Sequence, residues 1–172
     1  MQPGHNIDLR QSRSDMEEKD PQALSSSSTL DTSCLHHVLG HQLAMATAPT
    51  RKVFIKHIGQ PLDLRPAEFS MLLIIANNAG VTQKQLAQAL ALPAPKVTVM
   101  LDRLSEKGLL LRERNTTDKR SIRVHLTPAG QELADRGYQI SLRMENDLLR
   151  GLTQAERFML LELLNKVARR SR

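Results

Sequence analysis

Residues 86–130 read LAQALALPAPKVTVMLDRLSEKGLLLRERNTTDKRSIRVHLTPAG, and they are the most informative part of the chain for predicting its fold. It predicts a short helix, a proline-containing break at residues 92–95 and a second helix. Two strand candidates follow, residues 109–115 and 121–127, with turn residues between them. A close helix pair followed by a basic-tipped hairpin can grip duplex DNA, with the second helix in the major groove and the hairpin in the minor groove.

The second helix, from about Pro95 to Lys107, has a buried face and an open face. Its buried face has the i, i+3, i+4, i+7 spacing: Val97, Met100, Leu101 and Leu104. On the open side, Thr98 is expected to hydrogen-bond base edges, and Val99 and Pro95 to contact thymine methyl groups. Lys96 and Arg103, on the flank, suit base or phosphate contacts.

The hairpin loop supplies a second set of candidate DNA contacts. Arg120 at its tip is the candidate minor-groove probe. Asp118 is acidic, so we assign it to holding Arg120 or the turn by a charge-assisted hydrogen bond. The remaining basic side chains of the hairpin are expected to contact phosphates: Arg114, Lys119 and Arg123.

The first helix of the pair begins with a capping signal. Thr82 and Gln85 match a capping box, with Leu86, Ala87 and Leu90 on the core side of the helix. Backbone N–H groups and the helix dipole at such an end attract phosphate, so Thr82, Gln83 and Lys84 are candidate phosphate contacts. Plain capping is the alternative interpretation, and it does not exclude phosphate binding.

Helices are also predicted on both sides of this stretch. One long helix is expected from Leu30 to about Ile58, with a kink or break near Pro49. Pro66 opens another, whose expected buried face is Phe69, Leu72, Leu73 and Ala76. After Thr127-Pro128 a long helix carries the stripe Leu133, Gly137, Ile140, Met144 and Leu148. Thr153 and Glu156 form a capping box for a last helix, which is so apolar that we expect it to pack on a partner chain.

Positive charge gathers where the DNA contacts are predicted. The 172 residues carry a net charge of +6. Residues 93–125 hold eight basic and four acidic side chains, a net +4, whereas residues 1–29 are net −2. This distribution favours a polyanionic partner, double-stranded DNA. Aromatic residues make up only 2%, which argues against single-stranded nucleic acid, because such binding relies on aromatic stacking.

Composition and motifs also limit the cellular compartment and the kinds of function that the chain can have. The lone Cys34 excludes an intrachain disulfide and favours the cytoplasm. We find no apolar run long enough for a membrane span and no signal-peptide pattern, so no membrane partner is expected. The sequence has no Gly-rich phosphate loop, no H-E-x-x-H motif and no nucleophile elbow. We therefore expect neither an enzyme nor a cofactor; a basic interaction protein that does not bind DNA is an alternative.

Over about residues 30–170 the chain resembles the MarR family of bacterial winged helix-turn-helix regulators. The matching motifs are Leu101-Asp102-Arg103-Leu104 with Lys107-Gly108-Leu109, and Asp118-Lys119-Arg120 with Leu126-Thr127-Pro128-Ala129-Gly130. The family's D-x-R wing motif falls on Asp118 and Arg120. Val99 departs from the family, which often has Arg there, and Arg65 stands where a Ser or Thr cap often precedes the proline.

The resemblance implies a homodimeric repressor, with the first, fifth and sixth helices interleaved, that a small ligand or an oxidant releases from a pseudo-palindromic operator. The fold class is then mainly α with a small β-hairpin wing. We expect a disordered tail at 1–29, a dimerisation helix at 30–60, the winged helix-turn-helix lobe at 61–127 and dimerisation helices at 128–172.

The resemblance also implies an effector cleft between the dimer helices and the DNA-binding lobe. Its candidate residues are Arg51, Phe54, His57, Phe69 and Tyr138. Apolar walls with an Arg or His suit a small aromatic carboxylate, or its CoA thioester. The alternative is that these residues serve packing and the surface.

Two further candidates lie near residue 35. Cys34 stands close to where the peroxide-sensing branch of the family places its reactive cysteine, so peroxide sensing is an alternative function. That branch needs tyrosine partners and this chain has one tyrosine, so we expect a quiet buried thiol. His36, His37 and His41 crowd one predicted helix with zinc-like i, i+4 spacing for the last two, but no acidic third ligand follows on the same face, and we predict no metal site.

Overall fold

The computed structural model describes residues 30–114 and 122–169. The chain divides into two compact units, Met1–Val38 and Leu39–Arg172. The described part of the first unit holds a short 3-10 turn, η1 (Ser33–Leu35). Asp31 accepts a hydrogen bond from the Ser33 N–H at 2.9 Å, and this bond holds the pKa of Asp31 below its ordinary value.

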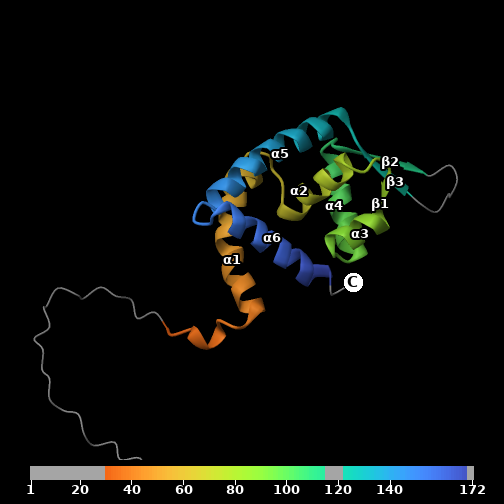
Figure 1. The fold of residues 1–172 in the computed structure, drawn as a ribbon. Helices are drawn as coiled ribbons and strands as arrows, with labels where there is room; N and C mark the ends of the chain where they lie inside the picture. The colour runs from red at the N-terminus through yellow and green to blue at the C-terminus, as the bar shows by residue number, and fades with distance from the viewer. Residues whose placement is uncertain (1–29, 115–121, 170–172) are drawn as a thin grey trace, which may run out of the picture. The chain divides into compact units, whose positions relative to one another are not determined.

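The second unit is mainly helical with one small sheet, which confirms the predicted fold class (Figure 1). Its elements, in chain order, are α1 (Leu39–Phe54), η2 (Ile55–Gly59), α2 (Pro66–Ala76), β1 (Val81–Thr82), α3 (Gln83–Leu90), α4 (Ala94–Glu106), β2 (Leu110–Arg114), β3 (Ile122–Leu126), α5 (Pro128–Leu148) and α6 (Gln154–Arg169).

The first long helix differs from the prediction at its start and around its proline. It begins at Leu39 rather than Leu30, and it runs through Pro49 without a break. Proline cannot donate a backbone hydrogen bond, but the side chain of the next residue bonds back to the helix. Thr50 Oγ1 donates to the Ala46 carbonyl at 2.7 Å, one turn back. The helix then passes into the wider turn η2, where the Gln60 N–H reaches the Ile55 carbonyl at 2.9 Å.

The sheet is antiparallel with the strand order β1–β3–β2. Both predicted strands are present, and the two-residue strand β1, which the sequence did not indicate, pairs Val81 with Val124. Val124 is buried and Leu126 is half-buried. Ile122 is 46% exposed. It is the first residue of β3.

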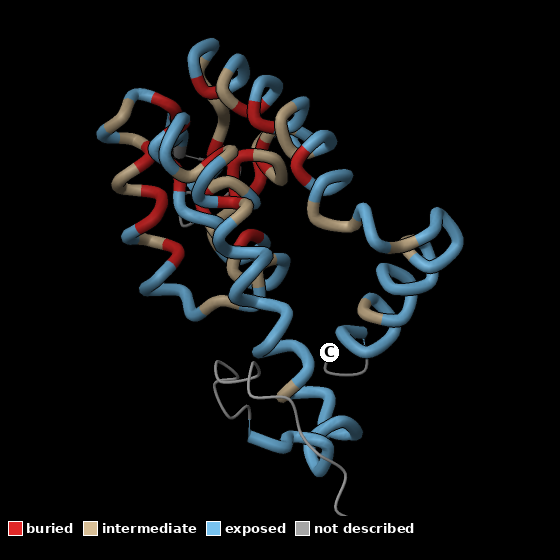
Figure 2. The backbone as a smooth tube through the Cα atoms, turned by 90° about the vertical axis from the view of Figure 1, so that its left-hand side faces the viewer, coloured by how far each residue is buried: buried red, intermediate tan, exposed pale blue. Residues whose placement is uncertain are grey.

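The hydrophobic core lies where α2, α3, α4, β3 and α5 meet, and Figure 2 shows the buried residues gathered there. The predicted buried face of α2 is only partly right, since Leu72 is buried but Phe69, Leu73 and Ala76 are half-buried. The fully buried residues of α2 are Glu68, Met71, Leu72 and Ile75. Nearly every side chain of this helix is apolar, so periodicity does not distinguish one face from another. The packing of neighbouring elements decides which face is buried.

The two C-terminal helices differ in how far they are covered. In α5 the buried positions are Gly130, Ala134, Gly137 and Met144. The Thr153–Glu156 capping box of α6 is confirmed, with the Thr153 N–H donating to Glu156 Oε2 at 2.8 Å. No residue of α6 is buried, as the tube in Figure 2 shows. Within the described ranges, no helix is long and apolar enough to cross a membrane.

Candidate nucleic-acid interface

The helix pair begins with a double cap on α3. The Gln85 N–H donates to Thr82 Oγ1 at 3.3 Å, and the Thr82 N–H donates to Gln85 Oε1 at 2.8 Å. The predicted capping box is confirmed. Ala91 ends α3 in the left-handed region with φ 52°, which turns the chain toward Pro93 and the start of α4. In Figure 1, α3 and α4 lie beside the β2–β3 hairpin.

Helix α4 has the two faces that the sequence predicts, and it begins at Ala94. Its four core residues are buried: Val97, Met100, Leu101 and Leu104. Pro95, Lys96 and Val99 are exposed, and Val99 is 63% exposed. Gly108, with φ 70°, reverses the chain after the helix, and the Leu109 N–H closes onto the Leu104 carbonyl at 3.0 Å. One side of α4 is thus free to meet a ligand as large as DNA.

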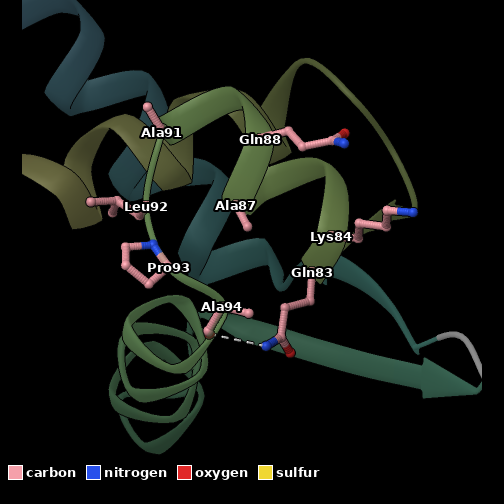
Figure 3. Close-up of a pocket in the computed structure, with 8 residues that line it drawn as sticks. All are labelled: Gln83, Lys84, Ala87, Gln88, Ala91, Leu92, Pro93 and Ala94. Carbon is pink, nitrogen blue, oxygen red and sulfur yellow. Dashed lines mark hydrogen bonds between the residues drawn. The ribbon is translucent and has the colours of Figure 1, made fainter. Parts of the chain in front are cut away.

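Thr98 is half-buried and its hydroxyl is already hydrogen-bonded. Thr98 Oγ1 donates to the Ala94 carbonyl at 3.1 Å and accepts from Gln83 Nε2 at 2.6 Å. Gln83 also donates to the Ala94 carbonyl at 3.3 Å, the bond drawn in Figure 3. Sequence reasoning placed both side chains on the DNA side but did not find that they hold each other.

An open groove of about 730 Å³ lies beside this bond, between α3 and the start of α4. Figure 3 shows the eight side chains that line it: Gln83, Lys84, Ala87, Gln88, Ala91, Leu92, Pro93 and Ala94. Lys84 is exposed at the first turn of α3, where the predicted phosphate contact requires it.

Arg103 forms ion pairs within the protein, so its guanidinium is not free to contact DNA. Its Nη1 contacts both carboxylate oxygens of Glu68, at 2.8 and 3.0 Å, and its Nη2 contacts Asp63 Oδ1 at 3.1 Å. Lys107 Nζ also donates to Asp63 Oδ2 at 2.6 Å. This hydrogen bond and the positive charge of Lys107 hold the pKa of Asp63 below its ordinary value. No pattern in the sequence predicts these ion pairs, which join residues 35 to 44 positions apart.

The hairpin is described only in part. Asp118, Lys119 and Arg120 lie outside the described residues, so their predicted contacts stay predictions. Arg114 pairs with Ile122 in the sheet register. Arg123 is exposed on β3, opposite Glu113 on one side and Thr82 on the other. Its position brings the base of the hairpin next to the capped start of α3.

A further ion pair joins α4 to the hairpin. Arg112 Nη2 on β2 lies 2.6 Å from Asp102 Oδ1 on α4. Both side chains are partly exposed, so the contact orients the two elements more than it stabilises them. Asp102 stands in a motif shared with the MarR family, but its pairing with Arg112 was not predicted, because a contact across ten residues between a helix and a strand leaves no periodic pattern.

Comparison with known proteins decides the family. The MarR family model matches residues 64–122. The multiple antibiotic resistance protein MarR of Escherichia coli K12 is 32% identical over 130 residues, which are 75% of this chain and 90% of that protein. The chain belongs to the MarR family. It is a DNA-binding transcriptional regulator with the winged-helix fold.

Two solved structures are similar to this MarR-family regulator. The transcriptional repressor CouR, bound to a 23-mer DNA duplex, superimposes with a TM-score of 0.76 at 33% identity, covering 82% of this chain and 99% of CouR. BpsR of Bordetella bronchiseptica, whose DNA binding is regulated by 6-hydroxynicotinic acid, gives a TM-score of 0.70 at 25% identity, covering 77% of this chain and 94% of BpsR.

The five candidate effector residues of this MarR-family chain do not form one cluster. Phe54 and Phe69 pack together with ring centroids 5.8 Å apart, and Phe54 belongs to the hydrophobic core. Arg51 and Tyr138 are exposed on α1 and α5. His57 lines a separate cavity of about 430 Å³ with Lys56, Pro61, Ile140, Arg143 and Asp147. The sequence missed the two additional cations of this cavity.

The candidates near residue 35 are placed differently from the prediction. Cys34 is exposed in η1, so the expectation of a buried thiol is wrong. His36 and His37 precede α1, which begins at Leu39, so the helical spacing predicted for His37 and His41 does not form. Among the described residues, no group of three His, Cys, Asp or Glu side chains could hold a metal ion.

Proposed function

We propose that this MarR-family chain is a homodimeric repressor that places α4 in the major groove of a pseudo-palindromic operator. The observation that carries the proposal is the free face of α4. Lys96 and Val99 are exposed on it, while the opposite side of the helix packs into the core. The likeness to DNA-bound CouR supports the same use of this helix.

The other contacts follow from the surroundings of α4. Lys84, with the capped first turn of α3, meets phosphate. Arg123 and Arg114 meet phosphate from the hairpin, and Lys119 and Arg120 extend the contact toward the minor groove. Arg103 holds α4 against α2 and makes no DNA contact, because its guanidinium already serves Glu68 and Asp63.

The dimer is proposed from the apolar surface of α6. Phe158 is 65% exposed and Leu161 is 53% exposed, and both line a cavity between α5 and α6. A second copy of the chain is the proposed cover of this surface, and reading two half-sites requires the two α4 helices to lie about 34 Å apart, one turn of DNA. Large apolar side chains that are exposed together on one helix are typical of an interface.

We further propose that a small aromatic carboxylate releases the operator. The cavity between η2 and α5 offers Lys56, His57 and Arg143 to a carboxylate and Ile140 to an apolar ring. The regulation of BpsR by 6-hydroxynicotinic acid supports this ligand class. Millimolar benzoates and hydroxycinnamates should weaken operator binding; a panel without any effect would remove this part of the proposal.

The first experiment is selection of genomic fragments with the purified chain, followed by gel shifts on the recovered site. Lys96→Ala should weaken binding and lower the slope of log affinity against log salt by about 1 if Lys96 meets a phosphate. Lys52→Ala, an equal loss of charge on the exposed side of α1, is the matched control. Failure to enrich any site, or equal losses for both variants, would contradict the proposed interface.

A further inference from the structure

The hydroxyl of Thr98 has little left to offer a base. A threonine hydroxyl has one proton to donate and two lone pairs to accept with. The proton goes to the Ala94 carbonyl at 3.1 Å, and one of the two lone pairs accepts from Gln83 Nε2 at 2.6 Å. To hydrogen-bond a base edge as a donor, Thr98 would have to give up its bond to its own helix.

Other polar side chains of α4 are engaged as well. Asp102 is paired with Arg112 at 2.6 Å. Arg103 is paired with Glu68 and Asp63. Lys96 is exposed but carries a point charge, which suits phosphate as well as a base. Direct hydrogen-bond recognition from this helix is therefore sparse.

Val99 is the contrasting feature of the same face. It is 63% exposed and lies outside the hydrophobic core and the groups packed against it. A single exposed valine needs no explanation on an ordinary surface. On a helix that enters the major groove it meets base edges, and the thymine methyl is the apolar group that those edges present.

We propose that α4 selects its operator through thymine methyl groups, with Val99 as the contacting side chain and Gln83 as the residue that holds Thr98 beside it. This inference rests on the proposed entry of α4 into the major groove. It names what the helix reads there: thymine, recognised by shape and apolar contact rather than by a hydrogen-bond pattern. Each half-site should then hold a thymine that cannot be exchanged for another base without loss.

The test replaces thymine by uracil in the selected operator, which removes the methyl group and leaves the Watson–Crick pair. Wild-type affinity should fall about fourfold for each contacted methyl, or about sixteenfold for a dimer that contacts one in each half-site. Uracil placed outside the selected operator site should have no effect on affinity. Binding is measured by fluorescence anisotropy at one fixed salt concentration.

Variants then assign the contact to Val99. Val99→Ala should bind the thymine and uracil duplexes with nearly equal affinity, because the side chain that touches the methyl is gone. Its exposure means that folding should be preserved, which circular dichroism checks. Val38→Ala, the same truncation at an exposed valine before α1, should keep the full response to uracil.

The outcomes separate the inference from the proposed function. Tight, sequence-specific binding that is equal for thymine and uracil would overturn the inference and leave the operator-binding proposal standing. A full uracil response retained by Val99→Ala would also overturn it, because another residue would then read the methyl. Failure of the wild-type chain to select any duplex would contradict the proposed function itself.

Discussion

Arg103 on α4 contacts both carboxylate oxygens of Glu68 on α2, at 2.8 and 3.0 Å, and the Glu68 side chain is only 1% exposed. Glu68 also accepts a hydrogen bond from the Arg65 N–H at 2.9 Å, so it caps the start of α2 as well. A buried carboxylate is tolerated when it is paired and hydrogen-bonded. This one contact joins the proposed recognition helix to the helix behind it.

The first prediction concerns that pair. Arg103→Met keeps most of the side-chain volume but leaves the buried Glu68 carboxylate without its cation. Loss of one partner of a buried pair typically costs about 3–5 kcal/mol, and we expect the lower end because Arg103 itself is partly exposed. Urea unfolding monitored by circular dichroism measures the change in the free energy of unfolding.

Arg112→Met is the matched control for Arg103→Met. It breaks the Arg112–Asp102 pair, in which both side chains are partly exposed, so it should cost less than about 1 kcal/mol. Equal losses for the two variants would show that the burial of Glu68 does not govern the effect.

A second prediction follows from Asp63. Its folded pKa lies below the ordinary value, chiefly because Lys107 donates a hydrogen bond to it. The contribution of Asp63 to stability is therefore complete above about pH 4, the unfolded value, and is lost as pH falls through the lower folded value. Asp63→Asn should lower the free energy of unfolding at pH 7, and its difference from wild type should shrink below pH 4.

The backbone conformation at residue 63 accommodates asparagine, so the substitution should change the charge without straining the chain. Asp63 has φ 47°, a left-handed conformation that asparagine also adopts. Lys107→Met should reduce the same acid-side dependence, because it removes the main cause of the pKa shift. A difference between Asp63→Asn and wild type that stays constant from pH 7 to pH 3 would rule out this account.

A third prediction tests the close approach of α5 to the chain before β2. A Cβ on Gly130 would lie 2.1 Å from the Leu109 carbonyl oxygen, so Gly130→Ala forces a backbone shift. We expect a loss of about 3 kcal/mol in urea unfolding. Gly40→Ala is the control, because a Cβ there meets nothing within 4 Å. It should leave stability unchanged or raise it by up to about 1 kcal/mol, since alanine favours a helix.

A fourth prediction tests the proposed dimer. Leu161→Glu places a charge in the exposed apolar surface of α6 and should shift the chain toward monomer in light scattering. Operator affinity should fall with it, because one recognition helix would then bind alone. Glu162→Gln, on the same helix, should remain dimeric. A Leu161→Glu variant that stays dimeric would exclude this surface as the interface.

Much of the fold could be predicted because its signals are local. The caps at Thr82 and Thr153 depend on residues three positions apart, and α4 follows from the spacing of its apolar side chains. The hairpin strands follow from turn residues and alternation. Each of these patterns involves contacts within one or two turns of chain, so the amino-acid order alone specifies them.

The candidate site could be predicted only as a surface. The sequence identified which residues of α4 face away from the core, and Pro95, Lys96 and Val99 are exposed as expected. It could not identify which of the polar side chains were already engaged. Lys119 and Arg120 remain predictions from the motif in which they stand.

The amino-acid order was sufficient to predict the main helices, the β2–β3 hairpin, the caps of α3 and α6 and the open face of α4. The packing of the elements, by contrast, is what pairs Arg103 with Glu68, Gln83 with Thr98, and β1 with β3. These contacts could not be predicted because their two partners lie far apart along the chain. Side-chain hydrogen bonds, charge pairs and strand pairing between segments 15 to 43 residues apart depend on how the elements pack, and no local periodicity predicts them.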